Sequence, residues 1–133
     1  MTRLHIYVIL LAALAFPSAG GGFAQETLKP GDVISGRLRL VKTRHLNGTP
    51  ISAYQIVADR PRAFAQKDEF CDDAPPKTFH LVVMDDKAKA SRLKREIGKK
   101  LAVIGEEFFC SQTAWHVGDA VVIKWRFAGP DGR

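Results

Sequence analysis

Apolar residues recur with the period of a β-strand over most of this chain, and the period changes once to that of a helix. Alternation predicts strands over residues 33–41, 52–58, 78–84, 99–109 and 120–127. Between the third and fourth of these, Ala90, Leu93 and Ile97 recur at spacings of three and four, which predicts a short amphipathic helix. The pair Asp85-Asp86 can cap its first turn. The order strand, strand, strand, helix, strand, strand constrains the fold more than any other feature.

That order is the order of the OB-fold, a five-stranded Greek-key barrel whose helix lies between strands three and four. Gly36 and Gly105 fall in the first and fourth strands, where a small barrel must bend sharply. An open α+β sheet covered by one helix has the same order of elements and is the alternative. We therefore expect a mainly β domain, an OB-fold-like five-stranded small barrel with one short helix between strands three and four.

The first 24 residues have the pattern of a secretory signal peptide. Arg3 supplies a positive charge, an apolar run follows from Ile6 to Phe16, and Gly22-Phe23-Ala24 offers small residues at a cleavage site. The run is too short to span a bilayer as a helix, and no second apolar stretch follows it. We expect a signal peptide over residues 1–24, a single OB-like domain over residues 25–133, and no transmembrane segment in the mature chain. The protein is then periplasmic or secreted.

Cys71 and Cys110 are the only cysteines in the sequence. An exported protein meets an oxidising compartment, and a domain of about 109 residues buries a modest share of its surface, so it gains from a covalent constraint. A redox or metal-ligand pair is the alternative, but the CxxC spacing typical of such pairs is absent from the sequence. The sequence therefore predicts one structural disulfide between Cys71 and Cys110.

The charged residues are distributed unevenly, although the net charge of +6 is moderate. Four acidic residues surround Cys71, and a later stretch collects seven basic ones: Lys87, Lys89, Arg92, Lys94, Arg95, Lys99 and Lys100. Such a separation attracts anionic partners from a distance, and a solvated helix face gives the same pattern. Nucleic acid is not the expected partner, because an export signal removes the chain from it and the basic segments lack interleaved aromatic residues.

The segment GKKLAVIGEEFFCSQTAWHVGD (residues 98–119) combines four short motifs. They are Gly98-Lys99-Lys100, Val103-Ile104-Gly105, Phe108-Phe109 and Thr113-Ala114-Trp115-His116. Together they resemble the signature of a small bacterial family of exported proteins whose domain is catalogued as being of unknown function. Members of that family also carry an acidic loop with a cysteine, similar to the region around Cys71. The resemblance implies an exported domain and brings no reaction or ligand with it.

In an OB-fold, ligands bind across strands two and three, between the loop that joins strands one and two and the loop that joins strands four and five. Basic residues beside an exposed tryptophan suit a polyanion or a sugar, because a flat ring stacks while cations pair with acidic groups. The alternatives are that the tryptophan plugs the barrel end and that the neighbouring histidine makes a structural hydrogen bond. The candidate ligand-binding residues in the two loops are Arg44, His45, Gln112, Thr113, Trp115 and His116.

Motifs for metal binding and catalysis are absent from the sequence. His45, His80 and His116 form no HxH, HxxxH or HExxH arrangement. Glu106 and Glu107 are neighbours on a strand, so they point to opposite faces and cannot flank one glycosidic bond. No nucleophile motif or phosphate-binding loop is present. We expect no metal site, no cofactor and no enzymatic activity.

The sequence thus favours a non-enzymatic exported binding module for an anionic glycan or another envelope component. The alternative is a protein-interaction subunit or inhibitor of an envelope or secreted complex. In that alternative, the long acidic segment from Asp59 to Lys77, constrained at Cys71, is the contact surface.

Overall fold

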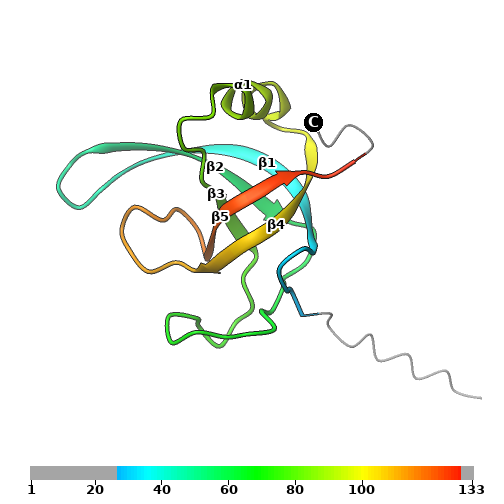
Figure 1. Ribbon diagram of the computed structural model, residues 1–133. Helices are drawn as coiled ribbons and strands as arrows, with labels where there is room; N and C mark the ends of the chain where they lie inside the picture. The colour runs from blue at the N-terminus through cyan, green and yellow to red at the C-terminus, as the bar shows by residue number, and fades with distance from the viewer. Residues whose placement is uncertain (1–26, 130–133) are drawn as a thin grey trace, which may run out of the picture.

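The computed structural model describes residues 27–129, and in them five strands close into a ring with one short helix at its end (Figure 1). The expected signal peptide lies outside the described residues. The elements in chain order are β1 (Val33–Arg44), β2 (Pro50–Ala58), β3 (Thr78–Leu81), α1 (Lys87–Glu96), β4 (Lys100–Cys110) and β5 (Ala120–Phe127). The prediction of a mainly β, five-stranded barrel with one short helix is confirmed. No helix in the described part of the chain is long and apolar enough to cross a membrane.

The strands follow the order β1-β2-β3-β5-β4 around the ring. Every neighbouring pair is antiparallel except β3 and β5, which run parallel. β1 pairs with both β2 and β4, and Gly36 takes part in both pairings. A Cβ atom at this position would lie 2.0 Å from the carbonyl oxygen of Val57, so only glycine allows the strands to approach this closely. The closed ring excludes the open α+β sheet.

The inner face of the barrel is the core of the protein. Fully buried side chains come from all five strands and include Ile34, Leu38, Ile56, Phe79, Leu81, Val103 and Val122. Most of these positions are the ones that strand alternation assigns to the interior. Burying one such side chain contributes about 1.5–3 kcal/mol, so these contacts dominate the stability of the ring.

The expected alternation is wrong in β5. Strict alternation over residues 120–127 would place Ile123 inward with Trp125 and Phe127 and Val122 outward, but Val122 is fully buried in the core and Ile123 is only partly buried. The pairing of β4 with β5 shifts register between Gly105 and Phe108, so the side chains that point inward change parity there. One irregularity follows Gly105, where the sequence predicts a sharp bend of the strand.

Helix α1 begins at its predicted cap. The Asp86 carboxylate accepts a hydrogen bond of 2.9 Å from the backbone N–H of Lys89. Leu93 is fully buried, and the Arg92 guanidinium lies 3.9 Å from the centre of the Phe127 ring. The helix therefore packs against one end of the barrel with a single apolar residue and the stems of basic ones.

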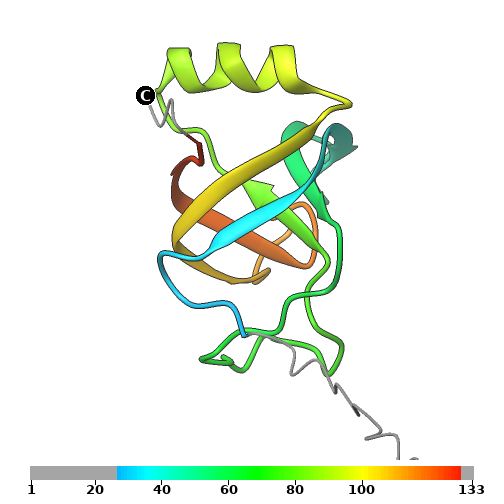
Figure 2. The same cartoon turned by 90° about the vertical axis from the view of Figure 1, so that its right-hand side faces the viewer.

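The long loop of residues 59–77 crosses the opposite end of the barrel from α1 (Figure 2). The disulfide between Cys71 and Cys110 ties it to the end of β4, as the sequence predicts. Phe64 is buried in the same loop, and its neighbours exchange backbone hydrogen bonds with Leu28. The two ends of the barrel are thus closed by different means, a helix at one and a cross-linked loop at the other.

Candidate functional site

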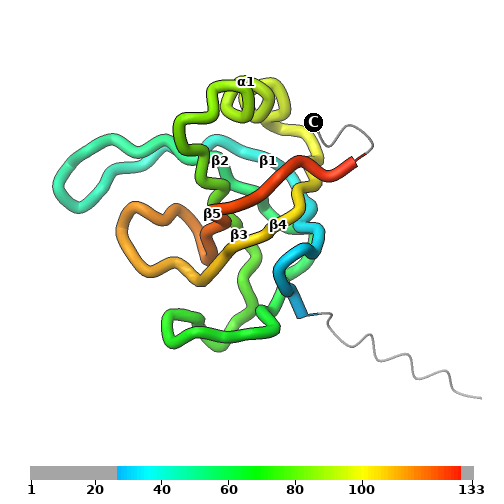
Figure 3. The backbone as a smooth tube through the Cα atoms, in the orientation of Figure 1, coloured from blue at the N-terminus to red at the C-terminus, as the bar shows by residue number. Residues whose placement is uncertain are grey.

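The two loops that the sequence singles out contact each other. The hairpin turn between β1 and β2 and the loop of residues 111–119 project to the same side of the molecule (Figure 3). The rings of His45 and Trp115 stack there, with centroids 3.9 Å apart and planes inclined by 16°. This stack joins a residue of the first loop to a residue of the second, so both loops border one site.

A cavity of about 410 Å³ lies beside this stack. We call it the side groove, and its principal wall residues are Ser52, Tyr54, His80, Met84, Trp115 and His116. β2 and β3 supply one wall, the segment that leaves β3 supplies another, and the loop of residues 111–119 supplies the third. The groove therefore lies over strands two and three of the barrel, between the two predicted loops.

The candidate residues divide into groove-lining and loop-shaping ones. Trp115 is 45% exposed and lines the groove, so it does not plug the barrel end. His116 also lines the groove, and its Nδ1 accepts a hydrogen bond of 3.0 Å from the backbone N–H of Gln112. His45 lies outside the lining and packs behind Trp115.

Three of the candidate ligand-binding residues use polar groups for contacts within their own loops. Arg44 donates from Nη1 to the backbone oxygen of Gly48 at 3.1 Å. The Thr113 hydroxyl accepts from the backbone N–H of Trp115 at 3.2 Å, and Gln112 contributes the backbone donor described above. None of the three is among the described residues that line the side groove. Their polar groups fix the shape of the loops.

The residue that holds the loop of residues 111–119 against the sheet is Gln55, which the sequence analysis did not single out. Its side chain is buried, with 2% exposed. Its Oε1 accepts from Arg39 Nε at 2.7 Å, and its Nε2 donates to the backbone oxygen of Val117 at 2.8 Å. Gly118 fits closely above it, because a Cβ atom at Gly118 would lie 2.6 Å from Gln55 Nε2. Gln55 is therefore the polar anchor of this loop on the outer face of β2.

Two histidines also fix the loop. The Nδ1 atom of His80 accepts from the backbone N–H of Val117 at 3.1 Å, much as His116 accepts from Gln112. Burial lowers the pKa of His80, and the nearby His116 lowers it further. Burial likewise lowers the pKa of His116. Because Nδ1 must be unprotonated to accept a hydrogen bond, both rings hold the loop in their neutral form.

The basic residues of the β1–β2 hairpin carry uncompensated charge. Ion pairs among the described residues join Lys29 to Asp32, Lys100 to Asp59, Lys124 to Glu107 and Arg126 to Glu106. None of these pairs includes Lys42 or Arg44, which are both exposed. The hairpin thus places positive charge beside the side groove.

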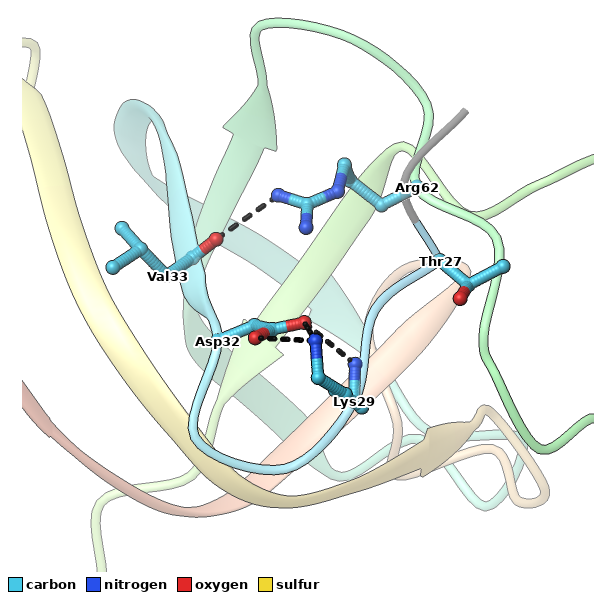
Figure 4. Close-up of a pocket in the computed structure, with 5 residues that line it drawn as sticks. All are labelled: Thr27, Lys29, Asp32, Val33 and Arg62. Carbon is cyan, nitrogen blue, oxygen red and sulfur yellow. Dashed lines mark hydrogen bonds and ion pairs between the residues drawn. The ribbon is translucent and has the colours of Figure 1, made fainter. Parts of the chain in front are cut away.

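A second cavity, of about 430 Å³, lies near the start of β1 (Figure 4). The charged side chains that line it bind other residues of the lining. Lys29 Nζ lies 3.3 Å from an oxygen of Asp32, and Arg62 donates from Nη1 to the backbone oxygen of Val33 at 3.0 Å. The hydrogen bond from the backbone N–H of Lys29 is the main cause that lowers the pKa of Asp32. These contacts stabilise the entry to β1.

The described residues bring one possible set of metal ligands together, namely Asp68, Cys71 and Cys110. The two sulfur atoms are joined in the disulfide, and a thiolate is the form of cysteine that binds metals. This cluster is therefore a structural cross-link.

In comparisons with known proteins, no protein-family model matches this chain, and neither a curated protein nor a solved structure matches it. Function is therefore inferred from the arrangement of side chains. The side groove is the place where the barrel geometry, an exposed aromatic ring and positive charge coincide.

Proposed function

We propose that this protein is a non-enzymatic exported binding module that engages an anionic glycan or another envelope component through the side groove. The observation that carries the proposal is the stack of His45 on Trp115, which joins two separate loops beside a cavity of about 410 Å³. The exposed indole offers a flat surface for stacking, and Lys42 and Arg44 supply positive charge nearby.

The architecture supports the same site. A five-stranded ring with the order β1-β2-β3-β5-β4 and a helix between β3 and β4 is the arrangement of an OB-fold. In that fold, strands two and three and the loops on either side of them bind ligands, and the side groove lies there. On these grounds we propose that the barrel is an OB-fold, and we keep the resemblance to the exported bacterial family as part of the proposal.

The chemistry of the groove supports binding without catalysis. The imidazoles of His80 and His116 both use Nδ1 to accept backbone N–H groups. Neither a carboxylate nor a cysteine is among the described residues that line the groove. A general base with a free lone pair and a partner acid or nucleophile is therefore not assembled at this site.

The proposal is tested by thermal unfolding of the oxidised protein with a panel of anionic glycans and peptidoglycan fragments. A ligand that binds only the folded state adds about 2.7 kcal/mol at a hundred times its dissociation constant, which raises the Tm by several degrees. We expect Trp115→Ala to weaken binding about fivefold or more, on the scale of the ~1–3 kcal/mol that the stacking of a flat ring on an aromatic side chain contributes.

Phe70→Ala is the matched control for this experiment. Phe70 is exposed to a similar extent as Trp115, 49% against 45%, but lies on the loop of residues 59–77. This variant should bind the ligand like the wild type. If affinity falls in Phe70→Ala and not in Trp115→Ala, the side groove is not the binding site.

A second function, that of a protein-interaction subunit or inhibitor, is favoured by Phe70 itself. This apolar ring is exposed on a loop that the disulfide constrains, and the backbone N–H of Phe70 donates to the Asp68 carboxylate at 2.9 Å. A rigid exposed aromatic residue is a common anchor in protein interfaces. In cells, crosslinking to a partner through this loop should be lost in Phe70→Ala and retained in Trp115→Ala. The opposite result would exclude this contact surface.

A further inference from the structure

Strand β2 continues beyond the end of its neighbour β3. β3 pairs with β2 only from Tyr54 to Val57, and the chain then turns away toward α1. The first residues of β2, 50–53, have a strand partner on the β1 side alone. β2 therefore has a free edge, and this edge forms a wall of the side groove.

The direction of the backbone groups along this edge follows from one hydrogen bond. The N–H of Ala58 donates to the oxygen of Lys77 at 2.8 Å, so Ala58 faces the β3 side of the sheet. In antiparallel sheets the direction of the backbone N–H and C=O groups alternates from residue to residue. The backbone groups of Tyr54 and Ser52 therefore point to the same neighbouring side as those of Ala58. Tyr54 is opposite Leu81 at the end of β3, whereas Ser52 lies beyond it. The N–H and C=O of Ser52 therefore point to the free edge.

Pro50 agrees with this assignment, because it is two residues before Ser52 and has no N–H to offer. Proline is tolerated in a sheet where its missing N–H would face an unpaired edge. On the opposite wall of the groove, Val83 follows β3. None of the loop backbone hydrogen bonds among the described residues joins Val83 to β2. The groove is thus a gap between two stretches of backbone that separate after Leu81.

The side chains around this gap are largely apolar. Val82, Val83 and Ala90 line it, together with Met84 and Trp115, which are 77% and 45% exposed. Leu46, at the tip of the adjacent hairpin, is 92% exposed. An extended polypeptide matches both features, because its backbone pairs with a strand edge and its alternate side chains enter apolar pockets. A glycan offers no comparable row of backbone donors and acceptors.

The positive charge beside the free edge of β2 indicates which charge the bound segment should carry. Lys42 and Arg44 are opposite Ser52 and Pro50 in the register of β1 with β2. Both basic residues are exposed, and no ion pair in the described residues includes them. Charge complementarity therefore favours a strand that carries carboxylates next to its apolar residues.

We propose that the side groove accepts an extended, acidic and apolar polypeptide strand that pairs with the free edge of β2 at Ser52. This inference rests on the proposed function and deepens it, because it names the envelope component as a polypeptide segment. The strand extends the β2 side of the ring, and it covers Met84 and Trp115.

The test compares two substitutions at one position. Ser52→Pro removes the edge N–H, whereas Ser52→Ala removes the hydroxyl and keeps that N–H. The probes are ten-residue peptides in which Val, Ile or Tyr alternates with Glu or Asp, and the readout is fluorescence anisotropy with the oxidised protein. We expect binding to wild type and Ser52→Ala, and at least a tenfold loss of affinity in Ser52→Pro. The same loss should follow when alternate backbone nitrogens of the peptide are methylated, and this second comparison holds even where Ser52→Pro folds poorly.

The outcomes separate this inference from the proposed function. If the peptides bind equally well after Ser52→Pro and after N-methylation, pairing at the β2 edge is refuted. If polygalacturonate binds in a Trp115-dependent manner and no peptide binds, the groove is a glycan site and only the strand inference fails. If neither class of probe binds, and Trp115→Ala has no effect on any ligand of the glycan panel, both proposals fail.

Discussion

The two long loops of the barrel, residues 59–77 and residues 111–119, are fixed by different forces. The first is tied to β4 by the Cys71–Cys110 disulfide and buries Phe64 in the core. The second is held to the outer face of the sheet at Val117, whose backbone oxygen accepts a hydrogen bond from Gln55 and whose backbone N–H donates one to His80. Covalent and apolar contacts do not depend on pH, whereas a hydrogen bond to a neutral imidazole does. The loop that borders the side groove is therefore the one whose attachment depends on pH.

The largest expected effect concerns the loop of residues 59–77. Replacing both cysteines, in Cys71→Ser/Cys110→Ser, removes a cross-link between residues 39 positions apart. The chain-entropy relation assigns a loop of this size about 4 kcal/mol, so chemical denaturation should show a loss of that order. Reductant should destabilise the wild type to the same extent and leave the double variant unchanged. An unchanged free energy of unfolding would show that the loop is held by its apolar contacts alone.

A smaller effect is expected at the polar anchor of the other loop. Gln55→Leu keeps the volume of the side chain but leaves the Val117 carbonyl and the Arg39 Nε without their present partners. Losing the partner of a buried polar group costs about 1–3 kcal/mol. Hydrogen exchange should accelerate in residues 111–119 and stay unchanged in residues 59–77. Gln112→Leu is the control, because this exposed side chain should change stability by less than about 0.5 kcal/mol. Equal acceleration in both loops would mean that they are not held independently.

The smallest effect is a dependence on pH. His80 and His116 have pKa values lowered by burial, so protons bind the unfolded chain more readily than the folded one as the pH falls. Stability should be complete above the ordinary histidine pKa of about 6.5 and should decline below it, toward the lowered pKa values of the folded state. Urea unfolding at pH 7.5 and pH 5.0 measures this decline. It should be reduced in His80→Gln/His116→Gln, and a decline of the same size in that variant would assign it to other groups.

The sequence was sufficient for features that depend on neighbouring residues. Alternation identified the five strands, Asp86 was recognised as a cap, and Cys71 and Cys110 could be paired because no other cysteine competes. The sequence was not sufficient to predict which side chains are buried where the pairing of two strands is irregular. Val122 is buried because Ile123 is an extra, unpaired residue of β5 between Lys124 and Val122, and the alternation of β5 does not reveal this irregularity.

The candidate site shows the same limit. Gln55 and His80 occupy outward positions of their strands, where alternation predicts solvent exposure. They are covered because the loop of residues 111–119 folds back over them. Val117 of this loop contacts Gln55 although the two residues are 62 positions apart in the sequence. Arg44 and Thr113, two of the candidate ligand-binding residues, have polar groups that contact backbone atoms of their own loops. The composition of a loop does not reveal how many of its polar groups are already engaged.

The place of β5 in the ring has a consequence for the order in which the strands can pair as the chain folds. Among the described residues β5 is the last strand in sequence, and it lies between β3 and β4. Until residues 120–127 emerge, β3 and β4 each lack a neighbour, and the ring cannot close. The hairpin of β1 and β2 needs only local contacts and can form early, but the barrel cannot be completed before residues 120–127 are available.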